Sequence, residues 1–216
     1  ARAAFEFGAE HQTAYYGQLA AERVGRPMDP ALLVTPQYPD WRETALAQSD
    51  LLQVALLLHR AGDWHEARRF VLHLARSLET EAELGALAQL WLDRGEPNFA
   101  INIAKLAVQS GVILPQAYFP RTGLELATLP APSDLVMAIA RRESEFDPAV
   151  VSHADARGLL QVLPGTGALM ARRLGIEFDA AQLTSDPDLN ALLGAAYLET
   201  LINEFGALPL VAAGYN

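Results

Sequence analysis

The chain has 216 residues, of which 51% are hydrophobic and 19% charged, and this composition is typical of a soluble globular protein with one or two domains. No apolar run approaches the roughly 18 residues that span a bilayer, so we expect no integral membrane segment. The net charge of −10, without a basic stripe, argues against nucleic-acid binding, and the absence of cysteine excludes disulfides and thiolate metal sites. Residues 1–8 hold neither an initiator Met nor a signal-type apolar core, which predicts a processed or excised piece.

The first 130 residues have the pattern of helices separated by proline-rich loops. Two segments repeat with a period of 33 residues, the matched positions being Leu57 with Leu90, Gly62 with Gly95, and Ala67 with Ala100. In each copy an apolar helix ends at a Gly and a second helix follows it. This spacing favours stacked helical hairpins, and we expect residues 1–130 to form a tetratricopeptide-like superhelix.

A second proline-rich stretch, from Pro115 to Pro132, separates these repeats from the C-terminal region. We place the domain boundary there, between residues 130 and 131. Further on, Asp186-Pro187-Asp188 combines an N-cap residue, a Pro at the first helical position and an early acidic residue, which predicts a helix that runs to Gly206. Because no window alternates with the period of a strand, the predicted fold class is all-α.

Glu143 lies on the apolar side of a helix that we expect to run from residue 134 to 146 and to end before Pro148. Its neighbours on that stripe are Leu135, Ile139 and Phe146. A carboxylate removed from water favours its protonated form, and the negative end of the helix dipole acts in the same direction. Such a group can serve as a general acid. The alternative is a structural ion pair with Arg142 or another arginine.

Polar residues and glycines follow Glu143 in a distinctive order. They are Glu143-Ser144, Ser152, Gly158-Leu159-Leu160-Gln161, Pro164-Gly165-Thr166 and Gly214-Tyr215-Asn216. This order resembles the catalytic domain of the soluble lytic transglycosylases, whose pattern is Glu-Ser, then Gly-Leu-Met-Gln, then Ala-Tyr-Asn. The resemblance covers residues 131–216 and implies a lysozyme-like α domain that cleaves peptidoglycan. The preceding region is similar to the superhelical linker of the same family, most clearly over residues 14–20.

The resemblance implies that Glu143 is the single catalytic acid and base. The residues that it implies for substrate binding are Ser144, Ser152, Gly158, Gln161, Leu163, Thr166, Tyr215 and Asn216. Within this set, Ser152 and Gln161 would bind sugar or N-acetyl groups, and Tyr215 would direct its hydroxyl at the Glu143 carboxyl. Gly158 would allow a close backbone approach at a tight turn.

The remaining polar positions of the set have subsidiary roles. Ser144 would help to hold the helix end, and Asn216 would support the groove. Each residue also has a purely structural alternative. Ser144 can bond its own backbone, Ser152 can be a turn residue, and Gln161 can be a satisfied buried amide. Tyr215 can be an aromatic core residue, and Asn216 a frayed terminus.

The sequence departs from the family pattern at several positions. Leu160 and Leu163 stand where Met is usual, and Gly167 and Gly214 stand where Ala is usual. Leu keeps the volume of a groove wall nearly constant, so we expect activity to be retained. The family continues beyond Tyr-Asn, whereas nothing follows Asn216, which predicts a catalytic domain that is truncated at its C-terminus.

The implied reaction cuts the bond between N-acetylmuramic acid and N-acetylglucosamine without water, leaves a 1,6-anhydromuramoyl end, and needs no metal or organic cofactor. Hydrolytic glycosidases use two carboxyl groups. Here Glu145 is expected to face water from the same helix, and Asp147 to end it. The implied partners are peptidoglycan glycan strands, with cell-wall proteins on the repeats, in the periplasm. Two alternatives remain: a hydrolase that resembles goose-type lysozyme, and a helical-repeat adaptor with an inert catalytic domain.

Overall fold

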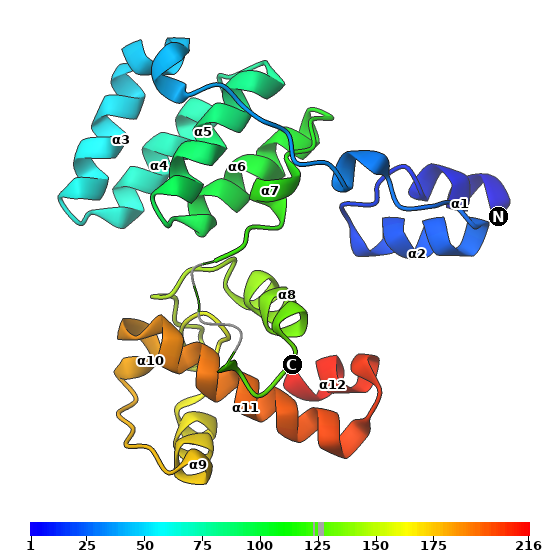
Figure 1. Ribbon diagram of the computed structural model, residues 1–216, viewed down its shortest axis with the longest axis vertical. Helices are drawn as coiled ribbons and strands as arrows, with labels where there is room; N and C mark the ends of the chain where they lie inside the picture. The colour runs from blue at the N-terminus through cyan, green and yellow to red at the C-terminus, as the bar shows by residue number, and fades with distance from the viewer. Residues whose placement is uncertain (123, 125–127) are drawn as a thin grey trace. The chain divides into compact units, whose positions relative to one another are not determined.

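The computed structural model describes residues 1–122, 124 and 128–216. The chain divides into two compact units, residues 1–120 and residues 121–216. In the described residues the regular structure is helical, and β-structure is limited to isolated bridges that join Val151 to Arg157 and Arg157 to Val162. The all-α prediction is therefore confirmed (Figure 1). Over the same residues no helix is both long enough and apolar enough to cross a bilayer.

The N-terminal unit consists of helices and short 3-10 turns. Its helices are α1 (Arg2–Gly8), α2 (Tyr15–Val24), α3 (Asp50–Arg60), α4 (Trp64–Ala75), α5 (Glu81–Asp93), α6 (Pro97–Gln109) and α7 (Pro115–Tyr118). Its 3-10 turns are η1 (Pro30–Leu32), η2 (Trp41–Glu43) and η3 (Ala45–Gln48). Side-chain caps explain several of the helix starts: Ser49 accepts from Leu52 N at α3, and Thr80 accepts from Glu83 N at α5.

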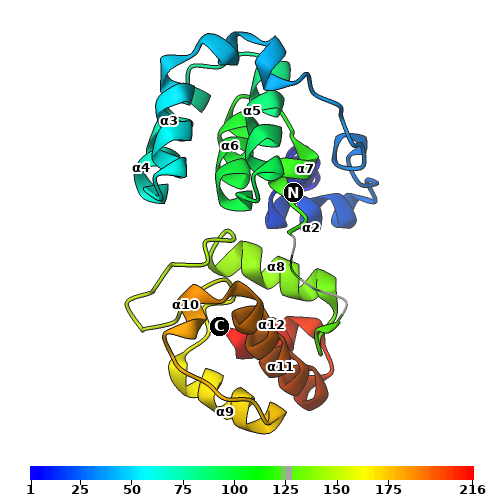
Figure 2. The same cartoon turned by 60° about the vertical axis from the view of Figure 1, so that its left-hand side comes forward.

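The two predicted hairpins are present as α3–α4 and α5–α6, and α4 also packs against α6 (Figure 2). Each first helix is followed by a glycine in the left-handed region, Gly62 at φ 82° and Gly95 at φ 75°. Glu96 ties the second hairpin to the first, because its carboxylate accepts a hydrogen bond from Trp64 Nε1 at 2.7 Å and lies 2.6 Å from His59 Nε2.

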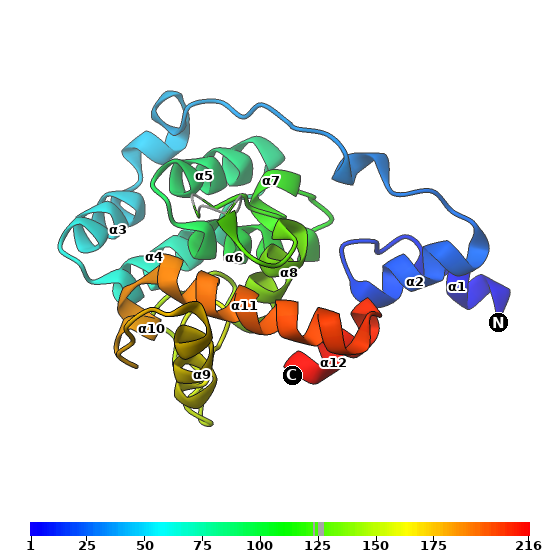
Figure 3. The same ribbon diagram turned by 60° about the horizontal axis from the view of Figure 1, so that its bottom comes forward.

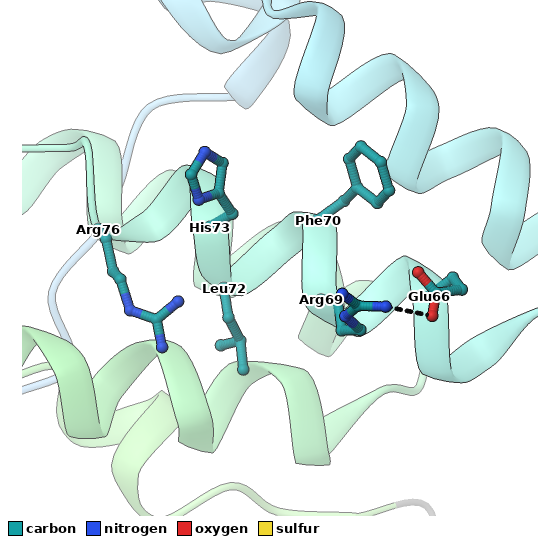
Figure 4. Close-up of a pocket in the computed structure, with 6 residues that line it drawn as sticks. All are labelled: Glu66, Arg69, Phe70, Leu72, His73 and Arg76. Atoms are coloured by element: carbon teal, nitrogen blue, oxygen red, sulfur yellow. Dashed lines mark hydrogen bonds and ion pairs between the residues drawn. The ribbon is translucent and has the colours of Figure 1, made fainter.

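A cavity of about 420 Å³ lies along α4 in this unit (Figure 4). It is lined by Glu66, Arg69, Phe70, Leu72, His73 and Arg76. Arg69 is paired with Glu66 at 2.7 Å, so part of the positive charge of this surface is already neutralised. All six lining residues belong to the N-terminal unit, whereas Glu143 lies in the C-terminal unit, so this cavity is not part of the site around Glu143.

The C-terminal unit is arranged around one long helix. Its helices are α8 (Ser133–Glu143), α9 (Pro164–Leu174), α10 (Gln182–Ser185), α11 (Pro187–Phe205) and α12 (Leu208–Tyr215). Helix α11 contacts all of the others (Figures 1 and 3). It begins as expected, with Asp186 accepting from Leu189 N at 3.0 Å and Pro187 in the first turn, and it ends at Gly206, where φ is 68°.

Candidate active site

Glu143 is the last residue of α8, and it continues the buried stripe formed by Val136, Ile139 and Ala140. It is itself half-buried. The prediction that the helix runs to Phe146 is wrong. Glu145 and Phe146 have positive φ values of 52° and 64°, so the chain leaves the helix in two successive left-handed residues.

The carboxylate of Glu143 forms no ion pair and no hydrogen bond within the part of the chain that the structure describes. The alternative of a structural pair with Arg142 is thus not observed, and Arg142 is exposed. The charge of Glu143 is nevertheless felt by Tyr215. Burial raises the pKa of Tyr215 strongly, and the charge of Glu143 raises it further.

Ser144 follows Glu143 and is buried. Its Oγ donates a hydrogen bond to Leu159 O at 2.7 Å and is also 3.1 Å from Ala140 O. Ser144 therefore connects the end of α8 to the loop that carries the Gly158–Gln161 segment. This contact lies next to the residue that the sequence marks as the acid.

The segment from Gly158 to Gln161 is a tight turn flanked by the isolated bridges. Gly158 has φ 70° and Gln161 has φ 48°. The Nε2 group of Gln161 donates to Val150 O at 3.2 Å and to Gly158 O at 3.1 Å, so both of its protons are used. The amide carbonyl of Gln161 is therefore the part of this side chain that can accept a hydrogen bond from a ligand.

Gly158 makes a close approach, but to the protein itself. A Cβ atom at this position would collide with Leu183 O and with Nδ2 of Asn190. Its N–H donates to Val150 O at 2.9 Å. A residue with a side chain would thus have to push the turn away from α11.

Asn190 is a residue that the sequence analysis missed. It is 0% exposed, its Oδ1 accepts from Leu160 N at 2.9 Å, and its Nδ2 donates to Arg157 O at 2.8 Å and Leu183 O at 2.9 Å. A signal was available, since Asn190 is a polar residue on the same face of its predicted helix as Leu193, Tyr197 and Leu201.

Tyr215 lies at the end of α12, and its hydroxyl donates to Leu160 O at 2.8 Å. Leu160 O is thus the observed partner of this hydroxyl, and its expected contact with the Glu143 carboxyl stays a prediction. The Tyr215 oxygen lies within the electrostatic influence of Glu143 and Tyr197, whose ring centroid is 5.6 Å from that of Tyr215. Two hydroxyls therefore donate to adjacent carbonyls of the same turn: Ser144 donates to Leu159 O, and Tyr215 donates to Leu160 O.

Four other predicted site residues lie outside this network. Ser152 holds its own turn, since its Oγ accepts from Ala156 N at 3.0 Å. Leu163 is 45% exposed and precedes α9, whereas Thr166 lies in its first turn. Asn216 is exposed after α12. Within the described residues no hydrogen bond joins these four to Glu143 or Tyr215.

The nearby carboxylates differ in their surroundings. Asp147 is buried, and its Oδ1 accepts from Ala149 N at 2.9 Å, so it stabilises the turn that follows α8. Glu145 is not helical, contrary to expectation, and it is only partly exposed. The geometry thus offers Glu143 as a carboxylate without a local structural task, beside a turn that is fixed by several hydrogen bonds.

Comparisons with known proteins agree on one family. The family model described as "Transglycosylase SLT domain" matches residues 127–216. A putative soluble lytic murein transglycosylase of Haemophilus influenzae is 38% identical over 104 residues, which cover 48% of this chain and 18% of that protein. The soluble lytic murein transglycosylase of Escherichia coli K12 is 29% identical over 218 residues, which cover 95% of this chain and 32% of that protein.

Solved structures give the same result. The complex of the 70-kDa soluble lytic transglycosylase with bulgecin A has a TM-score of 0.75 and 25% identity, over 96% of this chain and 34% of that chain. An inactive mutant of the lytic transglycosylase Slt from Pseudomonas aeruginosa has a TM-score of 0.71 and 30% identity, over 100% of this chain and 35% of that chain. The chain thus spans a third or less of the curated relatives' length. Its C-terminal unit thus carries a transglycosylase SLT domain, and nearly the whole chain is similar to part of the soluble lytic transglycosylases.

Proposed function

We propose that this protein is a peptidoglycan lytic transglycosylase that cuts the β-1,4 bond between N-acetylmuramic acid and N-acetylglucosamine, with Glu143 as acid and then base. The observation that carries the proposal is the position of Glu143. Its carboxylate is half-buried at the end of α8, has no ion pair within the described residues, and lies close enough to Tyr215 to affect its titration. The match to the SLT domain model supports the same assignment.

The proposed reaction balances without water. Glu143 gives its proton to the oxygen that links the two sugars, and the bond from that oxygen to C1 of the muramic acid breaks while the acetamido carbonyl stabilises the cationic ring. The Glu143 carboxylate then takes the proton of the C6 hydroxyl of the same sugar, whose oxygen forms a new bond to C1. The nucleophile is tethered in the substrate, so its effective concentration is high and solvent competes poorly.

The other residues of the site have supporting roles in this proposal. Ser144 and Tyr215 hold the turn beside Glu143, and Gln161 presents its carbonyl oxygen to an N–H or hydroxyl of the substrate. The remaining contacts with the glycan come from Gly158 within the turn and from four residues outside this network, which are Ser152, Leu163, Thr166 and Asn216.

We assign the catalytic domain to residues 131–216 and a tetratricopeptide-like superhelix to residues 1–130. The stacked hairpins α3–α4 and α5–α6, with Glu96 bonded across them, support the second assignment. The substrate places the activity in the periplasm, on peptidoglycan glycan strands, and cell-wall proteins are the proposed partners of the repeats.

A hydrolase that resembles goose-type lysozyme is the nearest competing function. It would use a second carboxylate to hold an attacking water. Asp147 is the buried carboxylate nearest in sequence, and its Oδ1 is engaged by Ala149 N at 2.9 Å. This engagement favours the reaction without water.

The test is digestion of purified sacculi by the wild-type chain, followed by mass spectrometry of the released muropeptides. Anhydro ends are expected, and reducing ends, which are heavier by one water, would favour the hydrolase. Glu143→Gln should lower the rate by about 100- to 10,000-fold, the usual contribution of a general acid and base. Glu177→Gln removes the same charge from an exposed position of the same unit and should leave the rate unchanged. If Glu143→Gln turned over like wild type, the assignment would be wrong, and a folded wild type without turnover would favour the inert adaptor.

A further inference from the structure

Asn190 is the buried polar group that joins α11 to the turn beside Glu143. Its side chain has one acceptor atom and two donor hydrogens, and each of them is used: Leu160 N donates to Oδ1, and Nδ2 donates to the carbonyls of Arg157 and Leu183. The residue is completely shielded from solvent. No part of this side chain is free for the substrate, so any effect on the reaction must pass through the turn.

The turn is hydrogen-bonded to the ends of two helices, α8 and α12. Leu159 O accepts the hydroxyl of Ser144, next to Glu143 at the end of α8, and Leu160 O accepts the hydroxyl of Tyr215 at the end of α12. The N–H of the same Leu160 is held by Asn190. One amide on α11 therefore controls the backbone that holds the ends of two other helices.

Glycines at both contacts bring this turn close to α11. Gly158 has no room for a Cβ because Nδ2 of Asn190 and Leu183 O occupy that space. Gly194, one helical turn after Asn190, would place a Cβ 2.7 Å from Cδ2 of Leu160. Leu160 is itself fully buried. The turn can therefore shift only if the packing against α11 opens.

We infer that Asn190 is a positioning residue for the reaction: it fixes the Gly158–Gln161 turn, and through Ser144 and Tyr215 it fixes the surroundings of the Glu143 carboxylate. The inference rests on the proposed function. An apolar side chain of similar size could fill the same volume, but it could not hold the N–H of Leu160 or the carbonyls of Arg157 and Leu183. Misplacement of a catalytic group by about 1 Å can cost about 100-fold in rate.

The main test variant is Asn190→Leu in the full chain, and its matched control is Asn98→Leu. Asn98 is an equally enclosed amide, 2% exposed, but it lies on α6 of the N-terminal unit, where it accepts from Arg68. Rates are measured on soluble glycan strands and are corrected for the folded fraction. For folded Asn190→Leu we expect kcat to fall by about 100-fold with little change in KM, whereas folded Asn98→Leu keeps the wild-type kcat.

Two further measurements separate positioning from general stability. Hydrogen exchange should accelerate at Leu160 and Gln161 in folded Asn190→Leu while the core of α11 stays protected. In a double-mutant cycle, the fold-loss of kcat in the Asn190→Leu, Tyr215→Phe double variant should be smaller than the product of the fold-losses in the two single variants. This non-additivity is expected because both residues hold the backbone of Leu160. Independent effects on kcat, or a folded Asn190→Leu with wild-type kcat, would overturn the inference.

If Asn190→Leu does not fold, Asn190→Asp takes its place. The Asp side chain keeps an acceptor for Leu160 N, but even when burial protonates it, its single O–H can donate to only one of Arg157 O and Leu183 O, and a loss of kcat of about tenfold is expected. Wild-type kcat in this variant, with exchange at Arg157–Leu160 accelerated, would also overturn the inference. A wild-type chain without turnover contradicts the proposed function itself, whereas turnover by wild type and by the Asn190 variants alike contradicts only the role of Asn190.

Discussion

Gly158→Ala tests the contact between the turn and α11 most sharply. Gly158 has φ 70°, a conformation that costs an L-residue about 1–2 kcal/mol. The added methyl would also overlap Leu183 O and the amide of Asn190, and overpacking of this kind costs about 1–3 kcal/mol. The two effects together predict that the free energy of unfolding of the C-terminal unit falls by about 2–5 kcal/mol.

Gly175→Ala is the matched control, because Gly175 follows α9 in the same unit at φ 71° and a Cβ there would meet nothing within 4 Å. This variant should lose only the conformational part, about 1–2 kcal/mol. The difference between the two variants therefore isolates the steric contact with Asn190 and Leu183.

The assay must report the C-terminal unit alone. The chain has three tryptophans, Trp41, Trp64 and Trp91, and all of them lie in the N-terminal unit, so fluorescence serves as an internal control. Native-state hydrogen exchange of α11 gives the free energy of opening of the C-terminal unit. Equal losses in Gly158→Ala and Gly175→Ala would refute the reasoning, because the turn would then have room to move.

Three further substitutions give distinct expectations. Ser144→Ala leaves the buried Leu159 carbonyl without its donor and should destabilise the C-terminal unit by about 1–3 kcal/mol in urea unfolding. The pKa of Tyr215 is raised by burial, so the unfolded chain loses the phenol proton first as the pH rises above about 10. The free energy of unfolding of wild type should therefore fall by up to about 1.4 kcal/mol per pH unit in this range. Tyr215→Phe should remove this slope, and an unchanged slope would contradict the burial of the hydroxyl. In the N-terminal unit, burial and the charge of Glu81 raise the pKa of Tyr38 to about 12, and its buried hydroxyl has no hydrogen-bond partner among the described residues. Tyr38→Phe should therefore leave the free energy of unfolding unchanged or raise it by about 1 kcal/mol. It should also reduce the loss of stability of this unit between pH 10 and 12, measured by tryptophan fluorescence. A clear destabilisation by this substitution would contradict the reasoning.

The helices were largely predictable because their signals are local. The glycines that follow α3 and α5, and the cap and Pro at the start of α11, fix where the chain enters and leaves each helix. The end of α8 was not predictable in the same way. Glu145 and Phe146 adopt left-handed conformations that neither residue type signals, and tertiary contacts such as that of Ser144 with Leu159 stabilise them.

The candidate site was predictable in its residue types but not in its connections. Sequence spacing identified Glu143 and the Gly158–Gln161 turn, yet it did not indicate that the hydroxyl of Tyr215 donates to Leu160 O. Asn190 is one polar residue in a mostly apolar helix, and sequence alone does not distinguish such a residue from one at the edge of the apolar face. Which backbone group a buried polar side chain binds depends on how distant segments pack, and this information is not local.

Cleavage of sacculi in water enriched in oxygen-18 tests the central claim most directly, namely that Glu143 drives attack by the substrate's own hydroxyl. The account predicts that wild type releases anhydro products without the heavy isotope, and that Glu143→Gln releases none. Heavy oxygen at the newly formed sugar end of the wild-type products, or normal turnover by Glu143→Gln, would contradict it.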